Sequence, residues 1–123
     1  MRRLARLAAV PAALFALGGL GLAGASSASA ATVNFTFCNN ASGVVAEAIF
    51  PQRGGFSTFV LSPGECNPTW TGINPGEPYV VRFHQQSNWN VYKDIANHWV
   101  WSCNERVAAV GNYGGSGVSE QCV

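Results

Sequence analysis

The side chains that could carry acid–base chemistry are two histidines and six carboxylates. Glycoside hydrolysis needs two converging carboxyl groups, and nucleophilic catalysis needs a nucleophile held against a base. The spacing of these residues brings no such groups together locally, and the G-x-S-x-G elbow of serine hydrolases is missing. We therefore expect a protein that is not an enzyme and that needs no cofactor. The residues are His84, His98, Glu47, Glu65, Glu77, Asp94, Glu105 and Glu120.

A second kind of chemistry is indicated by aromatic rings among amides in the stretch "HQQSNWNVYKD". A flat ring can cover the C–H groups of a pyranose, and amide groups can bond its hydroxyls. The stretch is typical of a solvated loop between two strands, and a tryptophan there could equally cover the edge of a sheet. The predicted ligand is an extracellular glycan or cell-wall polymer. The predicted ligand-binding residues are Gln85, Asn88, Trp89, Asn90 and Tyr92.

The alternative function is a proteinaceous inhibitor of a secreted hydrolase. Small, disulfide-bonded β domains suit that role because a rigid loop loses little entropy when it docks. The segment "FPQRGGFST", with Arg53 between a glutamine and two glycines, is the one stretch that resembles a presented basic residue.

The remaining tryptophans are interpreted as structural. Alternation in "HWVWSC" places Trp99, Trp101 and Cys103 on one face of a strand, and indoles beside a disulfide commonly fill the interior of a sandwich. We therefore predict that Trp99 and Trp101 lie in the core. Trp70 lies between turn signals and is predicted to cover an edge or end of the core.

The first thirty residues have the layout of a secretory signal peptide. Arginines at positions 2, 3 and 6 precede an apolar run, which ends in the small residues Ala28-Ser29-Ala30. A membrane anchor is the alternative, but glycines and Pro11 interrupt the run. We expect cleavage after Ala30, a single all-β domain over residues 31–123, and an extracellular location.

Charge excludes some partners of such a secreted chain. Without residues 1–30 the chain keeps four basic and six acidic side chains, a net charge of −2. The four cations are scattered, so they form no stripe that could neutralise phosphates of nucleic acid or an anionic membrane surface. We expect a monomer that binds neither. The four cations are Arg53, Arg82, Lys93 and Arg106.

Four cysteines follow the expected signal peptide, and their even number predicts two disulfides in an oxidising compartment. No two are separated by the two to four residues typical of structural zinc sites, so we expect no metal. Three pairings are possible. We favour Cys38 with Cys66 and Cys103 with Cys122, because this pairing closes the shorter loops, although spacing alone does not decide between them.

Hydrophobic residues after position 31 alternate with a period of two, which predicts strands. In "VNFTFC" the side chains of Val33, Phe35 and Phe37 share one face, and "NNASG" then favours a hairpin with the next strand. "SPGE" and "NPGE" predict type II turns, "GGSG" predicts a flexible turn, and "YKDIANHW" could form one helical turn. The fold predicted is all-β, a small disulfide-stapled β-sandwich of about seven to eight short antiparallel strands, with Greek-key connections as one possible arrangement. The expected strands span residues 33–38, 44–50, 56–62, 78–84, 90–95, 98–103, 106–113 and 118–123.

Overall fold

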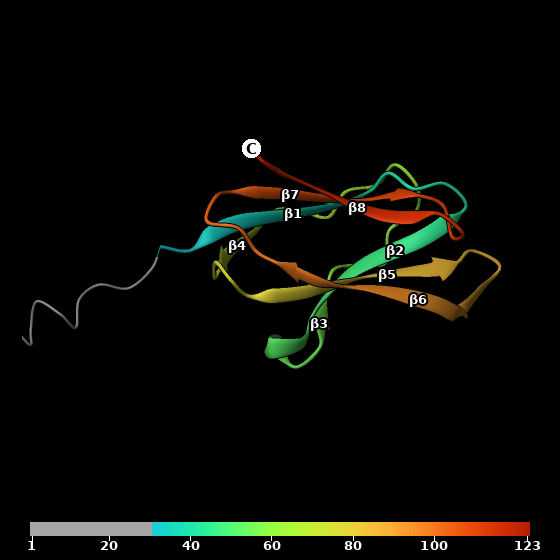
Figure 1. The fold of residues 1–123 in the computed structure, drawn as a ribbon, viewed down its shortest axis with the longest axis horizontal. Helices are drawn as coiled ribbons and strands as arrows, with labels where there is room; N and C mark the ends of the chain where they lie inside the picture. The colour runs from blue at the N-terminus through green and yellow to red at the C-terminus, as the bar shows by residue number, and fades with distance from the viewer. Residues whose placement is uncertain (1–30) are drawn as a thin grey trace, which may run out of the picture. The chain divides into compact units, whose positions relative to one another are not determined.

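Two four-stranded sheets form the domain in the computed structural model, which describes residues 31–123 (Figure 1). The strand orders are β4-β1-β7-β8 and β3-β2-β5-β6. The predicted signal peptide, residues 1–30, lies outside the described residues and stays a prediction. The strands are β1 (Val33–Asn39), β2 (Val44–Phe50), β3 (Phe56–Ser57), β4 (Trp70–Ile73), β5 (Pro78–Gln85), β6 (Asn88–Trp99), β7 (Glu105–Gly111) and β8 (Ser116–Cys122), and a short 3-10 helix, η1 (Pro51–Arg53), follows β2.

The core lies between the two sheets, as Figure 1 shows for the layer of β1, β7 and β8 above that of β5 and β6. Aromatic rings from both sheets meet there: the ring of Phe35 lies 5.1 Å from that of Phe50 and 5.3 Å from that of Tyr79. Val33 and Phe37 are also buried, so the predicted alternation of the first strand is confirmed. The predicted β-sandwich is thus the observed fold.

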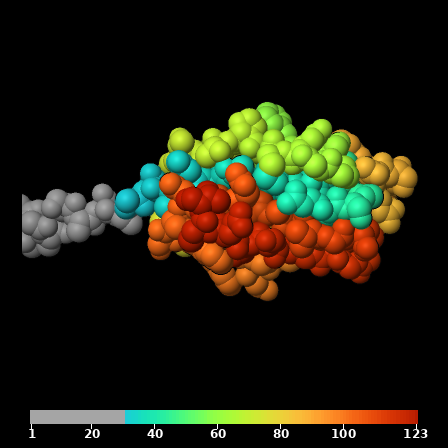
Figure 2. Space-filling view, turned by 90° about the horizontal axis from the view of Figure 1, so that it is seen from above, coloured from blue at the N-terminus to red at the C-terminus, as the bar shows by residue number. Residues whose placement is uncertain are grey.

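Both predicted disulfides are present, and they join neighbouring cysteines in the sequence. Cys38 is bonded to Cys66, and Cys103 is bonded to Cys122. The second bridge lies where β8 ends, and Figure 2 shows these C-terminal residues, in red, on the face formed by the sheet of β7 and β8. The pairing that closes the shorter loops is therefore confirmed.

The two Pro-Gly turns have the geometry that their sequences predict. Gly64 and Gly76 adopt positive φ angles of 88° and 82°. The amide of Glu65 donates to the carbonyl of Ser62, and that of Glu77 donates to the carbonyl of residue 74, each over 3.1 Å. A positive φ at the third residue is the mark of a type II turn.

The predicted hairpin of β1 with β2 is wrong, because these strands lie in different sheets. β1 pairs antiparallel with β4 and parallel with β7, which is a departure from the expected antiparallel pairing. Asn39 explains how the chain crosses over. Its buried amide donates to the carbonyls of Val44 and Leu61 at 3.0 and 2.9 Å and accepts the amide of Ala41. One side chain therefore bonds backbone groups on both sides of the crossover, including the Leu61 carbonyl, which also accepts the amide of Ala46.

The predicted strand at 56–62 is only partly formed. Phe56 and Ser57 pair with β2 as β3, and Leu61 makes an isolated bridge to Ala46. Thr58 lies between them: its hydroxyl accepts the amide of Ala48 at 2.9 Å. The segment therefore follows the edge of β2 without being a continuous strand.

The region predicted as a loop, a strand, a helical turn and another strand is a single long strand, β6 (Asn88–Trp99). The loop is reduced to a two-residue turn at 86–87, and no helical turn forms at 92–99. β6 is an edge strand, because within residues 31–123 it pairs only with β5.

A bulge near the end of β6 changes which side chains face the core. Ile95 lies opposite Val81 and His98 lies opposite Tyr79, so the β6 strand has one residue more than β5 in this interval. Asn97 adopts a φ of 67°, the left-handed conformation that bulges commonly use. One extra residue moves every following side chain to the other face of the strand.

The prediction that Trp99 and Trp101 lie in the core is wrong for this reason. After the bulge, Val100 faces the core with 3% of its surface exposed, whereas Trp99 and Trp101 are 54% and 43% exposed. Trp99 lies on the outer face of β6, and Trp101, which follows the end of that strand, is exposed as well. Trp70 behaves as expected: it is half-buried and covers the core, with its ring 5.8 Å from that of Phe50.

Candidate functional site

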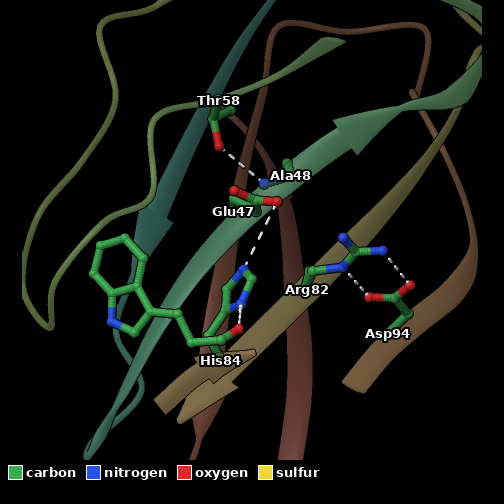
Figure 3. Close-up of polar contacts among 7 residues, drawn as sticks. Glu47, Ala48, Thr58, Arg82, His84 and Asp94 are labelled. Atoms are coloured by element: carbon green, nitrogen blue, oxygen red, sulfur yellow. Dashed lines mark hydrogen bonds and ion pairs between the residues drawn. The ribbon is translucent and has the colours of Figure 1, made fainter. Parts of the chain in front are cut away.

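The outer face of the sheet β3-β2-β5-β6 carries the charged and aromatic side chains of the candidate site. Arg82 of β5 lies between Glu47 of β2 and Asp94 of β6 in the strand register, and His84 lies opposite Tyr92. Their neighbours along β5, such as Phe83, point into the core. Figure 3 shows Glu47, Arg82, His84 and Asp94 coming together from the three strands.

An irregularity at the start of β6 places two predicted aromatic residues on this face. Gln85 pairs with Asn88 and His84 pairs with Tyr92, so residues 89–91 have no partners on β5. The three extra residues bring the Trp89 ring round to His84, with ring centroids 6.3 Å apart, while the Tyr92 ring lies 5.7 Å from His84 on the same face. Trp89 is 53% exposed and Tyr92 is 47% exposed. The sequence left open whether Trp89 is exposed or covers a sheet edge, and in the structure both rings are about half exposed.

His84 holds this irregular backbone in place. Its Nδ1 lies 2.8 Å from the carbonyl oxygen of Trp89. A carbonyl oxygen can only accept, so Nδ1 carries the hydrogen and donates it. The other ring nitrogen, Nε2, is buried and has no hydrogen-bond partner in residues 31–123, and it lies 3.7 Å from the carboxylate of Glu47. The histidine is therefore a support for the Trp89 backbone.

Arg82 and Asp94 form a two-bond ion pair beside the rings. Nε of Arg82 donates to Oδ1 of Asp94 at 2.7 Å, and a terminal nitrogen donates to Oδ2 at 2.9 Å. The hydrogen bonds that Arg82 donates to Asp94 raise the pKa of Arg82, and burial opposes that rise in part. The guanidinium carbon lies 4.0 Å from the centre of the Tyr92 ring. This cation–π contact fixes the ring and covers one of its faces.

The three predicted amide residues differ in how free they are. Asn88 accepts the backbone amide of Asn90 at 3.1 Å through its side-chain oxygen, so it supports the turn. The side chain of Asn90 is exposed, and that of Gln85 is half-buried at the end of β5. Within residues 31–123, neither side chain makes a hydrogen bond to another residue, so both can bond a ligand. The fold therefore brings all five predicted residues to one end of the β5–β6 hairpin.

A buried polar cluster that the sequence pattern did not reveal lies between the sheets, at the other end of β6. The Tyr79 hydroxyl donates to Oε1 of Glu120 at 2.6 Å, and Nδ1 of His98 contacts the same oxygen. Glu105 accepts the amide of Trp101, but its second oxygen is buried without a partner in the described part of the chain. These residues come from β5, β6, β7 and β8, so no spacing in the sequence could have grouped them.

Burial governs the ionisation of this cluster. Removal from water raises the pKa of the Glu105 carboxyl, and the bond from the Trp101 amide opposes that rise. Burial and the bond to Glu120 raise the pKa of Tyr79, which keeps the phenol protonated as a donor. Tyr79 and Glu105 are inaccessible to a ligand in this arrangement. The cluster is therefore a link between the sheets.

Arg53, the residue of the inhibitor alternative, is exposed at the end of η1, but its guanidinium is held in an ion pair. Its guanidinium donates two bonds to the buried carboxylate of Glu77, at 2.5 and 3.0 Å, and a third to the carbonyl of Gly72. The hydrogen bond to Glu77 raises the pKa of Arg53. A cavity of about 390 Å³ lies beside this ion pair, lined by Gln52, Arg53, Asn74, Pro75, Gly76 and Glu77. Its charged groups already pair with each other, and it contains none of the exposed aromatic residues, so we give more weight to the aromatic face.

Residues 31–123 contain no group of three or more His, Cys, Asp or Glu side chains that could hold a metal ion. No helix in that part of the chain has the length and apolar character needed to span a membrane. No protein-family model, curated protein or solved structure matches the chain.

Proposed function

We propose that this protein is a secreted, non-catalytic, monomeric binding module that recognises extracellular glycan or cell-wall polymer through the outer face of β5 and β6. The observation that carries the proposal is the pair of half-exposed rings, Trp89 and Tyr92, fixed on one face beside free amide groups. An indole that stays exposed adds little to the fold through burial, but a sugar ring can stack on its free face.

Rigid positioning supports this proposal. His84 donates a hydrogen bond to the carbonyl oxygen of Trp89. The guanidinium of Arg82 packs on the ring of Tyr92 and is itself held by its ion pair with Asp94. A surface that is ordered before binding loses little conformational entropy when a ligand arrives. Two disulfides are consistent with an oxidising, extracellular location.

The hydrolase-inhibitor alternative has weaker support. An inhibitory loop has to offer its side chain to the pocket of an enzyme, and Arg53 would first have to leave the carboxylate of Glu77. Breaking this ion pair would leave the buried carboxylate of Glu77 without its partner, which costs free energy.

The experiment is a retention assay on insoluble polysaccharides, run beside capture of secreted hydrolases from the same culture. We expect the wild-type chain to bind polysaccharide, and Trp89→Ala to lose retention with little change in melting temperature. Phe59→Ala is the matched control, because Phe59 is 72% exposed but lies along the opposite edge of the sheet. Retention of hydrolases without retention on any polysaccharide would support the inhibitor function instead.

A further inference from the structure

Trp99 lies on the same outer face as the rings of the proposed site, and Trp101, two residues further on, is also exposed. Trp99 is opposite Pro78 in the register, next to the inward-facing pair of His98 and Tyr79, so its side chain points outward with those of Tyr92 and Asp94. Trp99 and Trp101, which were predicted to lie in the core, therefore add to the exposed aromatic surface of Trp89 and Tyr92.

Strand geometry continues past the end of β6. The Val100 amide donates to the carbonyl of Glu77 at 2.9 Å, and its carbonyl accepts the amide of Gly76 at 2.7 Å. Val100 is thus held beside the chain that leads into β5, with its side chain buried. The residues on either side of it, Trp99 and Trp101, both face away from the core.

Three of the four rings, Trp89, Tyr92 and Trp99, belong to β6, and Trp101 follows it. The bulged residues add no length, because Trp89 lies beside His84, level with Tyr92, and Val100 before Trp101 is bonded to residues 76 and 77. The rings therefore lie in a row over the backbone from residue 76 to His84, about eight steps, or about 26 Å at about 3.3 Å per residue. That length exceeds what a single sugar ring can cover, and it follows the exposed edge of the sheet. Because β6 pairs only with β5 among the described residues, nothing in residues 31–123 pairs with its outer edge.

The charges on this face indicate an uncharged ligand. Arg82 is neutralised by Asp94, and the mostly buried Glu47 faces His84. Lys93 points to the other side of the strand, where its ammonium lies 4.9 Å from the centre of the Tyr113 ring. The described part of the row therefore offers no unpaired cation for an anionic polymer.

The geometry points to one continuous binding surface, formed by Trp89, Tyr92, Trp99 and Trp101, for an extended chain of a neutral linear polysaccharide. This inference rests on the proposed function and makes it more specific in two respects. It adds two binding residues at the far end of β6, and it predicts that affinity depends on the length of the ligand.

The test compares wild type, Trp89→Ala, Trp99→Ala, Trp101→Ala and Phe59→Ala for binding to neutral polysaccharides and to soluble fragments of increasing length. Wild-type affinity is expected to rise with fragment length until the row is filled. Trp99→Ala should weaken binding of the long polymer about 5-fold or more, the equivalent of one lost aromatic contact, and should not change binding of the shortest fragments that Trp89 retains. Trp99→Phe should recover much of the loss, and thermal unfolding checks that each variant is folded.

The outcomes separate this inference from the proposed function. Glycan binding that needs Trp89 but is unchanged in Trp99→Ala and Trp101→Ala would overturn the continuous row and leave the proposed function standing. Binding restricted to anionic wall polymers, and lost with added salt, would overturn the choice of a neutral ligand. A wild-type chain that retains no polysaccharide at all would overturn both.

Discussion

A polar substitution at Val100 should destabilise the domain more than the same substitution at either neighbouring tryptophan. The reason is the bulge at Asn97, which turns Val100 inward and leaves Trp99 and Trp101 about half exposed. By size alone, the opposite order would be expected, because an indole buries far more surface than an isopropyl group when both lie in a core.

The magnitudes follow from burial. Val100 is 97% removed from solvent, so Val100→Asn loses about 1.5–3 kcal/mol of apolar burial and adds about 1–3 kcal/mol for an amide buried without a partner. The total, about 2.5–6 kcal/mol, is a large share of the 5–15 kcal/mol typical of such domains. Trp99→Asn loses only the contacts of the covered half of the indole, about 1–2 kcal/mol.

Urea unfolding followed by tryptophan fluorescence and circular dichroism measures both variants. In a thermal scan, Val100→Asn should lower the melting temperature by at least about 10 °C, since about 4 °C or more is lost per kcal/mol in a domain of this size. Trp101→Asn serves as the second outward-facing position and should resemble Trp99→Asn. If Trp99→Asn were as destabilising as Val100→Asn, the inferred reversal of faces after Asn97 would be refuted.

Three further predictions concern the elements that hold the face in place. Asn97→Gly should be tolerated, whereas Asn97→Val should lose about 1–2 kcal/mol in chemical unfolding, because a β-branched residue disfavours a φ of 67°. Replacing Cys38 and Cys66 together by serine should lower stability by about 2–5 kcal/mol, and thiol titration of the unfolded wild type before and after reduction checks that the bridges had formed. Burial raises the folded-state pKa of Glu105 above its unfolded value, so its contribution to stability is complete at low pH and declines as pH rises through the raised pKa. Glu105→Gln should therefore show a smaller loss of stability between pH 4 and pH 7 than wild type, and equal losses in unfolding titrations would contradict this.

Local chemistry explains what could be predicted from the sequence. The two Pro-Gly turns need only four residues each, and the alternation of Val33, Phe35 and Phe37 is complete within one strand. Such features are decided within a few residues, so they do not depend on how the sheets assemble. The polar neighbours of Trp89 and Tyr92 indicated a solvated stretch, but they did not decide whether Trp89 is exposed or covers a sheet edge.

Features that depend on distant partners could not be predicted in the same way. β1 and β2 are adjacent in sequence, yet the buried amide of Asn39 lets the chain cross to the other sheet. Tyr79, His98 and Glu120 meet only because three strands from two sheets end together. The ion pair of Arg53 with Glu77 likewise joins a loop to a turn more than twenty residues away.

The error at Trp99 and Trp101 shows how one residue of backbone can decide between a structural and a functional interpretation. Regular alternation from the inward-facing Ile95 would carry both indoles into the core, where they would stabilise the fold. The extra residue at Asn97 instead places Val100 inward and Trp99 on the face that already holds Tyr92. The irregular backbone at 89–91 has a similar effect at the other end of β6, where it brings the Trp89 ring beside His84. Because bulges re-aim side chains, these two irregularities decide which rings of β6 stay outside the core.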